Sequence, residues 1–424
     1  MQSTKHGIMQ TIGWSKIRRR LFDAYFKSEG SCYAATVIAR FGERHLHALT
    51  NCRIYTGSAC LEGHAVLIDG RRINAIVAVG DIPAGARVLD LQSGYLAPGF
   101  IDAQVNGGGG LMFNDAPSVE TITRIAKAHR RFGTTGLLPT LITDSRAHIA
   151  DAIDAVAVAL AEGVPGVLGI HLEGPNISSE CSGIHEKRHI SNLHEENISR
   201  LGALEATRIV TLAPECAAPS LITQLVAKGV RVSAGHTAAS AEQIDTAAEE
   251  GLSGITHLFN AMSQFNSREP GVVGAALAHP DLWCSIIVDG FHAHDRSVAA
   301  AWRAKRPGKL FLVSDAMAPV GANMDSFVVA GKKISIKNGS CRTVDGRLAG
   351  STLDMARAVR NCVTRISIPL DEALRMAATY PAEYLQLDGI LGKIEAGFNA
   401  NLVWLDKELN VRATWIDGDM EYHE

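Results

Sequence analysis

The stretch GITHLFNAMSQFNSREPG, residues 254–271, decides how the rest of the chain is interpreted. It opens as a short apolar strand and ends in a polar loop. His257, the pair Asn260 and Ala261, and then Arg268 follow one another along it. An imidazole can bind a metal ion, two backbone positions can bind a polar ligand, and a guanidinium can bind an anion. The stretch therefore predicts a strand whose end carries the chemistry of a functional site.

The middle of the chain repeats this arrangement of an apolar strand, a polar strand end and a helix. The eight candidate strands are residues 96–105, 134–142, 167–172, 208–212, 230–234, 254–259, 284–288 and 310–313. Segments with helical periodicity, such as SAEQIDTAAEEG, separate them. These units predict an α/β fold, a (β/α)8 TIM barrel, whose active site lies at the C-terminal strand ends. A doubly wound sheet is the alternative, but no G-x-G-x-x-G motif follows the first strand.

The two ends of the chain have a different pattern from the middle. Residues 47–96 and 386–424 consist of short alternating strands, which predict one small β-sandwich built from both ends around a barrel at 97–385. Residues 326–350 predict a β-hairpin inserted in the barrel, with Asn338 and Gly339 as its turn. Residues 1–46 form a basic, weakly amphipathic extension that we expect to be poorly ordered; it lacks the apolar segment of a signal peptide.

Composition excludes several classes of protein. The net charge is −3 and the sequence pI is about 6.6, so no strong field favours nucleic acid or an anionic membrane. No apolar run approaches the ~18 residues of a membrane span. The eight cysteines are scattered without a C-x-x-C pair. This usage indicates a reduced, cytoplasmic enzyme rather than a disulfide scaffold or a zinc ribbon.

Seven of the predicted strand ends carry polar side chains. In chain order these are Asp102, Gln104 and Asn106; His171 and Glu173; Glu215; His236; His257; Asp289, His292 and His294; and Asp315. Each one alone has an ordinary structural explanation, because a strand-end histidine or a buried carboxylate is usually satisfied by its neighbours. In a barrel, however, all strand ends meet at one mouth. The set therefore predicts an active site.

Glu173, His236 and His257 form the best metal-binding set among these residues. One carboxylate and two imidazoles leave open positions for water and substrate, as a hydrolytic metal site requires. Asp315 suits a general base that takes a proton from water and passes it to the leaving group.

Three further residues suit contacts to the substrate. Arg268 suits an anionic group. His292 could bind the same anion, and His185, in a loop after the third strand, is another candidate contact.

From about residue 47 to the C-terminus the chain resembles the amidohydrolase superfamily and, within it, the N-acetylglucosamine-6-phosphate deacetylase family. The matching motifs stand in order: LAPGFIDAQVNG, GTTGLLPTLITD, GIHLEGPNIS, TLAPE, GHT, THLFNAM, REPG, DGFHAH, SDAMAP and GRLAGSTL. The resemblance implies a barrel of amidohydrolase type that binds a divalent metal ion through Glu173, His236 and His257, with Asp315 as the acid/base. It also implies substrate contacts from Ile184, His185, Asn260, Ala261, Arg268, Asp289, His292, Leu348, Ala349 and Gly350.

One departure from the superfamily pattern concerns the first strand. Many amidohydrolases carry H-x-H there, whereas this chain has Gln104 and Asn106, a candidate remnant of a second metal site. Neutral amides are poor zinc ligands compared with imidazole. The bridging lysine of the fourth strand is also absent, since Ala213, Pro214 and Glu215 stand there. Both changes predict one divalent ion per chain, expected to be Zn²⁺, with Fe²⁺, Co²⁺ or Mn²⁺ compatible with the same ligands.

The resemblance implies deacetylation of N-acetyl-D-glucosamine 6-phosphate to D-glucosamine 6-phosphate and acetate by a homodimer, in amino-sugar catabolism and cell-wall sugar recycling. The near-neutral charge and the lack of a long apolar run predict no nucleic-acid or membrane partner. Two other hypotheses remain open at this stage. The chain could hydrolyse another amide, such as a cyclic one of the dihydroorotase type, although H-x-H and the bridging lysine are missing. It could also be a catalytically silent scaffold, although the metal ligands and Asp315 are all present.

Overall fold

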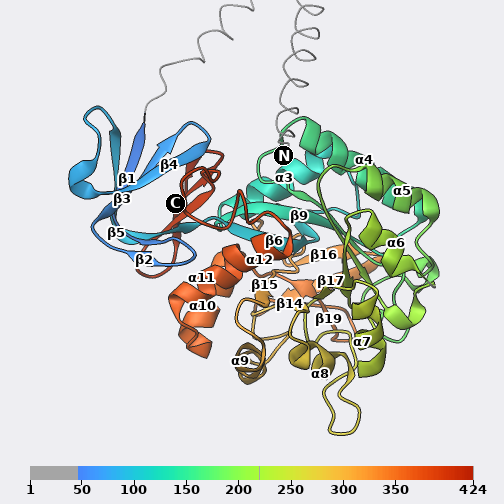
Figure 1. The fold of residues 1–424 in the computed structure, drawn as a ribbon. Coiled ribbons are helices and arrows are strands. Elements are labelled where there is room, and N and C mark those ends of the chain that lie inside the picture. Colours follow the sequence, from blue (N-terminus) through green and yellow to red (C-terminus); the bar gives the residue numbers. More distant parts are fainter. Residues whose placement is uncertain (1–45, 219, 424) are drawn as a thin grey trace, which may run out of the picture. The chain divides into compact units, whose positions relative to one another are not determined.

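The computed structural model describes residues 46–218 and 220–423, and Figure 1 shows the arrangement of their elements. Eight parallel strands form the central sheet, in the order in which they follow along the chain. They are β6 (Phe100–Val105), β9 (Thr134–Ile142), β10 (Gly169–Glu173), β11 (Thr207–Leu212), β12 (Arg231–Ala234), β13 (Gly254–Ile255), β14 (Trp283–Ile286) and β15 (Leu310–Leu312). The predicted barrel is confirmed.

The first and last strands of this sheet close the ring. The backbone N–H of Asp315 donates to the carbonyl of Gln104 at 3.1 Å, and that of Asn106 donates to Ala316 at 2.9 Å. These bonds join the ends of β6 and β15. Gln104, Asn106 and Asp315, which the sequence predicted as site residues, thus make the bonds that close the barrel. These bonds fix the C-terminal ends of β6 and β15 relative to each other.

Helices surround the sheet and begin at conventional capping residues. Ser118, Ser145 and Asp354 accept hydrogen bonds from the first turns of their helices, and Ser240 forms a complete capping box with Gln243. The helices are α3 (Val119–Arg130), α4 (Arg146–Ala161), α5 (Glu195–Ala203), α6 (Leu221–Ala227), α7 (Ala241–Glu249), α8 (Gly271–Ala278), α9 (Asp295–Ala304), α10 (Met355–Ile366), α11 (Leu370–Leu374) and α12 (Tyr380–Tyr384), with a π-helical turn at Arg375–Thr379 between the last two.

Strands from both chain ends build a second sheet with its own apolar core. Its strands are β1 (His47–Tyr55), β2 (Cys60–Leu61), β3 (His64–Asp69), β4 (Arg72–Ala78), β5 (Arg87–Pro98), β20 (Leu402–Leu405), β21 (Val411–Ile416) and β22 (Asp419–Tyr422). Leu96 belongs to β5 and pairs with Ile54 and Trp404. The first barrel strand, β6, therefore begins at Phe100 and not at Leu96, because Leu96 is hydrogen-bonded within the second sheet, called the end sheet below.

The inserted element is larger than the predicted hairpin. It is a four-stranded antiparallel sheet of β16 (Ser326–Val329), β17 (Lys332–Lys337), β18 (Ser340–Arg342) and β19 (Leu348–Ser351). The predicted turn is confirmed: Asn338 and Gly339 have φ of 51° and 78°, as a tight two-residue turn between antiparallel strands requires. The apolar underside of this insert packs on Met112, Ile142 and Met317 of the barrel mouth.

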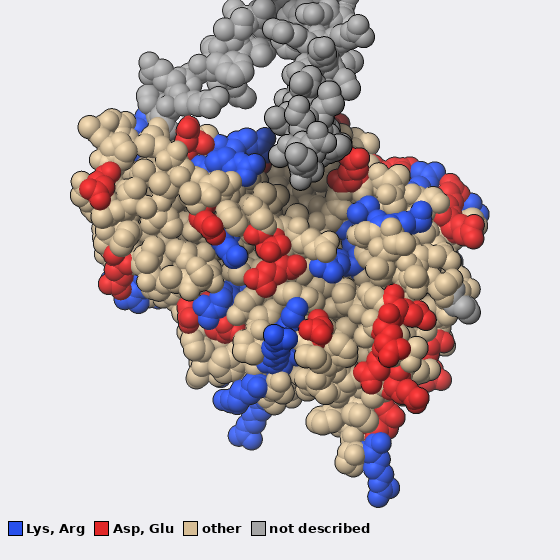
Figure 2. Space-filling view, viewed as in Figure 1, with Lys and Arg blue, Asp and Glu red and all other residues tan. Residues whose placement is uncertain are grey.

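Two other expectations concern regions and surfaces outside this core. The predicted N-terminal extension lies outside the described residues. Within the part that the structure describes, no helix combines the length and apolarity needed to cross a membrane. Figure 2 shows lysine and arginine interspersed with aspartate and glutamate over the visible face, with acidic side chains gathered near α7. This face offers no continuous basic surface of the kind that binds nucleic acid.

Candidate active site

The site residues stand where barrel strands turn into loops. His236, His257 and Asp315 have positive φ angles of 50°, 37° and 50°. Left-handed backbone is uncommon for residues with a Cβ and persists only where the surrounding structure enforces it. Here each turn rotates a side chain from the strand end towards the axis of the barrel mouth. The same fold thus supplies both the turn and the convergence of the side chains.

Three donor atoms converge at the mouth of the barrel. Oε1 of Glu173 lies 3.2 Å from Nε2 of His236 and 2.9 Å from Nε2 of His257, and the two Nε2 atoms are 3.1 Å apart. Donor atoms around a tetrahedral zinc ion with bonds of ~2.0–2.2 Å lie about 3.3–3.6 Å apart. All three side chains are buried. The triangle therefore has close to the size that one divalent ion requires.

The protonation of the imidazoles supports the same interpretation. Nδ1 of His236 lies 2.8 Å from the carbonyl oxygen of Cys181, so it carries the proton and Nε2 presents its lone pair to the triangle. Nδ1 of His257 has no hydrogen-bond partner among the described residues. The Nε2 lone pair of His236 and the Glu173 carboxylate repel each other at 3.2 Å unless a cation lies between them. The residues present therefore fit a divalent metal ion.

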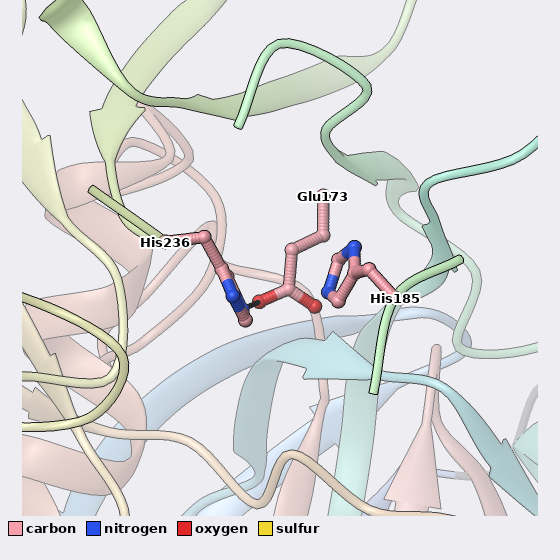
Figure 3. Close-up of side chains that lie close together, drawn as sticks. All are labelled: Glu173, His185 and His236. Carbon is pink, nitrogen blue, oxygen red and sulfur yellow. Dashed lines mark hydrogen bonds and ion pairs between the residues drawn. The ribbon is translucent and has the colours of Figure 1, made fainter. Parts of the chain in front are cut away.

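His185, which the sequence predicted only as a loop residue that contacts the substrate, lies directly beside this triangle. Its ring nitrogen and the donor atoms of Glu173 and His236 lie within 4.8 Å of one another, and Figure 3 shows the Glu173 carboxylate between the two rings. The backbone N–H of Thr143 donates to Nδ1 of His185 at 3.3 Å. A neutral ring that accepts at Nδ1 carries its proton at Nε2. His185 is thus arranged as a hydrogen-bond donor, and burial lowers its pKa well below the usual range.

Asp315 is held by the two amides that replace the H-x-H histidines. Asn106 donates from Nδ2 to Oδ1 of Asp315 at 2.6 Å, and Gln104 donates from Nε2 to the same oxygen at 3.1 Å and to Oε1 of Glu173 at 3.0 Å. Burial, and next the charge of Glu173, raise the pKa of Asp315 to about 6. Gln104 and Asn106 therefore bind carboxylates in this structure, and Asp315 itself lines the pocket.

Asp289 and His292 form a separate buried pair. Oδ2 of Asp289 accepts from Nδ1 of His292 at 2.7 Å, while Oδ1 accepts from the backbone N–H groups of Phe291 and His292. Burial alone lowers the pKa of His292, but Asp289 outweighs it and raises that pKa. Asp289 does not line the pocket, whereas His292 does. The pair therefore presents to the pocket an imidazole whose protonated form Asp289 favours.

A cavity of about 400 Å³ connects these groups. Of the residues predicted from the sequence, Asn106, Glu173, Ile184, His185, His236, His257, Asn260, Ala261, His292, Asp315, Leu348 and Gly350 line it. Ala349 packs in the core of the insert instead, because alternate residues of a strand face opposite sides. His294 caps α9, and Glu215 binds the backbone N–H of Ala238. Those two residues are structural here.

Arg268 lies apart from the cavity of its own chain. It is exposed in the loop that precedes α8, and that loop extends away from the barrel in Figure 1. Conversely, the cavity is lined by Ile142, Met262 and Met317, which sequence reasoning missed. No local signal distinguishes these apolar residues from ordinary core positions. Only their place at the mouth, beside the polar strand ends, separates them.

The fold and the site define a class of protein. A model described as the amidohydrolase family matches residues 95–420, and a model described as the NagA composite domain matches residues 46–96. The chain belongs to the amidohydrolase family, whose members are metal-dependent hydrolases.

Two curated relatives are informative about the particular branch. The chain is 47% identical over 333 residues to an N-acetylgalactosamine-6-phosphate deacetylase of Shewanella sp. (strain ANA-3), covering 78% of this chain and 84% of the relative. It is 37% identical over 376 residues to an N-acetylglucosamine-6-phosphate deacetylase of Haemophilus influenzae, covering 88% and 98%.

The solved structures that the chain resembles are also N-acetylglucosamine-6-phosphate deacetylases. The chain resembles the N-acetylglucosamine-6-phosphate deacetylase of Pasteurella multocida with a TM-score of 0.87 and 38% identity, covering 89% of this chain and all of that one. It also resembles a variant of the enzyme from Mycobacterium smegmatis, solved in complex with N-acetyl-D-glucosamine-6-phosphate, with a TM-score of 0.82 and 30% identity over 89% and 99% of the two chains.

Proposed function

We propose that this chain hydrolyses the N-acetyl group of N-acetyl-D-glucosamine 6-phosphate and releases D-glucosamine 6-phosphate and acetate. The observation that carries the proposal is one cavity that joins the Glu173, His236 and His257 triangle to His292, whose pKa Asp289 raises. A site of this kind suits a substrate with an amide at one end and an anion at the other. The deacetylase relatives support the same substrate class.

Glu173, His236 and His257 would hold one divalent ion, for which we propose Zn²⁺; Fe²⁺, Co²⁺ and Mn²⁺ suit the same donors. When bound, such an ion polarises the amide carbonyl and lowers the pKa of water. Asp315 takes a proton from the attacking water, whose oxygen forms a bond to the carbonyl carbon. His185 donates from Nε2 to the carbonyl oxygen as negative charge develops there. The C–N bond then breaks as Asp315 returns the proton to the sugar nitrogen.

In this proposal the phosphate binds on the side of the pocket opposite to the reacting amide. His292 supplies a charge-assisted hydrogen bond, and the backbone at Asn260 and Ala261 supplies further polar contacts. Arg268 is exposed and does not line the pocket of its own chain, so we propose that it reaches the phosphate bound by a second protomer. This requires a homodimer.

N-acetyl-D-galactosamine 6-phosphate is a second candidate substrate. The relative with 47% identity is named for that sugar. The two sugars differ in the orientation of one hydroxyl group, and both place the amide and the phosphate at the same positions. We further propose that the enzyme works in the cytoplasm in amino-sugar catabolism and cell-wall sugar recycling. The cysteines of the described range are all free, which agrees with a reducing compartment.

Acetate release tests this proposal directly. We would assay N-acetylglucosamine 6-phosphate, N-acetylgalactosamine 6-phosphate and unphosphorylated N-acetylglucosamine on one preparation whose metal content is measured. We expect turnover of the phosphorylated sugars, little turnover of the neutral sugar, and about one metal ion per chain. Metal-loaded protein that hydrolyses none of the three would contradict the proposed substrate and direct attention to other amides.

A further inference from the structure

We infer that Glu180 binds a hydroxyl group of the sugar ring, on one of the two carbons that flank the acetamido group, and so takes part in substrate specificity. The inference rests on the proposed function and extends it to recognition of the sugar. The proposed function assigns partners to the amide and to the phosphate of the substrate. It leaves the ring hydroxyls between these two ends without a partner.

The carboxylates of Glu173, Glu180 and Asp315 line the pocket, and the first and last of them already have roles. Glu173 belongs to the metal triangle, and Asp315 is held by Asn106 and Gln104. Within the described residues, the carboxylate of Glu180 forms no hydrogen bond or ion pair. A carboxylate accepts hydrogen bonds and cannot donate. Glu180 therefore suits a sugar hydroxyl, which donates, and not the phosphate, which it would repel.

Basic side chains near Glu180 leave its carboxylate free. Lys332 and Arg188 line a neighbouring cavity together with Glu180. Lys332 donates to the carbonyl oxygen of Ile184 at 3.2 Å, and Arg188 pairs with Glu186. Both cations thus have other partners, and Glu180 keeps its capacity to accept hydrogen bonds from a ligand.

Glu180 belongs to a turn that is fixed to the metal-site residue His236. The backbone N–H of Ser178 donates to the carbonyl oxygen of His236 at 2.8 Å, and Nδ1 of His236 donates to the carbonyl oxygen of Cys181 at 2.8 Å. Within the turn, the backbone N–H of Glu180 donates to Oγ of Ser178 at 3.3 Å. Both ends of the turn are thus tied to one residue. The side chain of Glu180 therefore starts from a fixed backbone beside the metal triangle.

The place of this turn decides which hydroxyls Glu180 can reach. In the proposed function the acetamido group binds at the metal triangle, and this group is attached to C2 of the sugar. The ring carbons bonded to C2 are C1 and C3, and each carries a hydroxyl. The C4 hydroxyl lies further along the ring towards the phosphate. We therefore expect Glu180 to contact the C1 or the C3 hydroxyl rather than the C4 hydroxyl.

A purely solvated role for Glu180 predicts a different result from a binding role. Glu180 is exposed, and exposed glutamates commonly have no partner other than water. The substrate is an anion, so removing a solvated carboxylate near the pocket should leave kcat/KM unchanged or raise it. Removing a carboxylate that accepts from the substrate should lower kcat/KM. The sign of the change separates the two roles.

The exposure of Glu180 also limits the size of the effect, because water competes for the same hydrogen bond. We expect Glu180→Ala to lower kcat/KM for N-acetylglucosamine 6-phosphate about tenfold, the low end of the range for a hydrogen bond to a charged group. Substitution at an exposed loop position should not disturb folding.

The test measures kcat/KM for N-acetylglucosamine 6-phosphate, its 1,5-anhydro analogue, which lacks the C1 hydroxyl, and its 3-deoxy analogue. The enzymes are the metal-loaded wild type, Glu180→Ala and Glu186→Ala. Glu186 is the matched control, because it lies in the same loop and carries the same charge but does not line the pocket. We expect Glu180→Ala to slow hydrolysis of the parent sugar but not of the analogue that lacks the contacted hydroxyl. Glu186→Ala should show no such difference between substrates.

The outcomes separate the inference from the proposed function. If the wild type is active and Glu180→Ala leaves kcat/KM unchanged or raised, the inference alone is overturned. An equal fall for the parent sugar and both analogues, or the same pattern in Glu186→Ala, also overturns it. A metal-loaded wild type that hydrolyses none of the three sugars overturns the proposed function and the inference with it.

Discussion

Two pairings of carboxylates with histidines occur at the barrel mouth, and they differ in how the partners meet. Glu173 faces two imidazoles whose Nε2 atoms approach the same carboxylate oxygen and each other. Asp289 faces one imidazole, His292, through Nδ1, and its other oxygen accepts two backbone N–H groups. The first cluster directs the lone pair of His236 and the Glu173 carboxylate at one point, whereas both oxygens of Asp289 have hydrogen-bond donors.

This difference shows why a histidine close to a carboxylate does not by itself identify a metal ligand. In the Glu173 cluster the tautomer of His236 is set from outside by Cys181, so the site requires a cation to balance it. In the Asp289 pair the carboxylate holds a proton on His292 and directs Nε2 outwards. The first arrangement fits a metal cation, whereas the second favours a protonated imidazole.

Asp315 lies between the two clusters. The charge of His292 acts on its carboxyl group, and Asn106 and Gln104 fix one of its oxygens. It is thereby positioned to exchange a proton with a group bound between the metal triangle and the phosphate side. Substitutions in the two clusters and in Asp315 should consequently have separable effects.

Glu173→Gln should have the largest effect. The change removes the charge that holds the two imidazoles together, so we expect loss of bound metal and a loss of activity beyond the about 10²–10⁴-fold of an acid/base group. Metal analysis and acetate release on the same sample measure both. Retention of a full equivalent of metal would show that the triangle is not the binding site.

Asp315→Asn should be nearly as severe in turnover but should spare the metal. An amide cannot accept the proton of water, so we expect kcat to fall by about 10²–10⁴-fold with metal content and KM little changed. Near-normal kcat would rule out Asp315 as the acid/base. Glu173→Gln serves as the contrast, because there the metal is lost as well.

Asp289→Asn should have a smaller and different effect. Without the carboxylate, burial lowers the pKa of His292, and the cation proposed to bind phosphate is lost at neutral pH. A hydrogen bond to a charged group contributes about 1.5–3 kcal/mol, so we expect KM to rise about 10–100-fold with kcat affected less. A fall in kcat at constant KM would instead indicate a role in the chemical step.

The same substitution should change how stability depends on pH. The raised pKa of His292 contributes stability that is complete below about pH 6.5 and is lost as pH rises through its folded value. The lowered pKa of Asp289 contributes stability that is present above about pH 4 and is lost as pH falls through its folded value. The difference in Tm between the wild type and Asp289→Asn should therefore be largest near pH 5–6 and shrink towards pH 9. A difference that grows with pH would contradict the ion pair.

The sequence predicted the barrel closely where strands are long and apolar. Residues 134–142 were predicted as a strand and form β9 with the same bounds. Such segments are buried on both faces, so the apolar run itself reports their length. The start of the first barrel strand was less predictable, because Leu96 is equally apolar but pairs with Ile54 in the end sheet. The sequence around a strand does not show which distant strand it pairs with, so its sheet cannot be predicted locally.

The insert illustrates the same limit. Its tight turn was evident from Asn338 and Gly339, since positive φ at two successive residues favours this pair. That the insert has four strands, and that its underside covers Met317, followed only from tertiary packing. Met317 and Ile142 have the composition of ordinary core residues, so no pattern along the chain distinguishes a pocket wall from a core.

The sequence alone determined the fold class and the candidate metal ligands, because strand ends in a barrel must converge and the residue types limit the chemistry available there. Only the tertiary structure decided how those residues divide their work. It made His185 a hydrogen-bond donor through Thr143, made Asp289 a support for His292, and placed Arg268 outside the pocket of its own chain. These roles depend on distances and tautomers between segments remote in sequence, and such contacts exist only once the chain has folded.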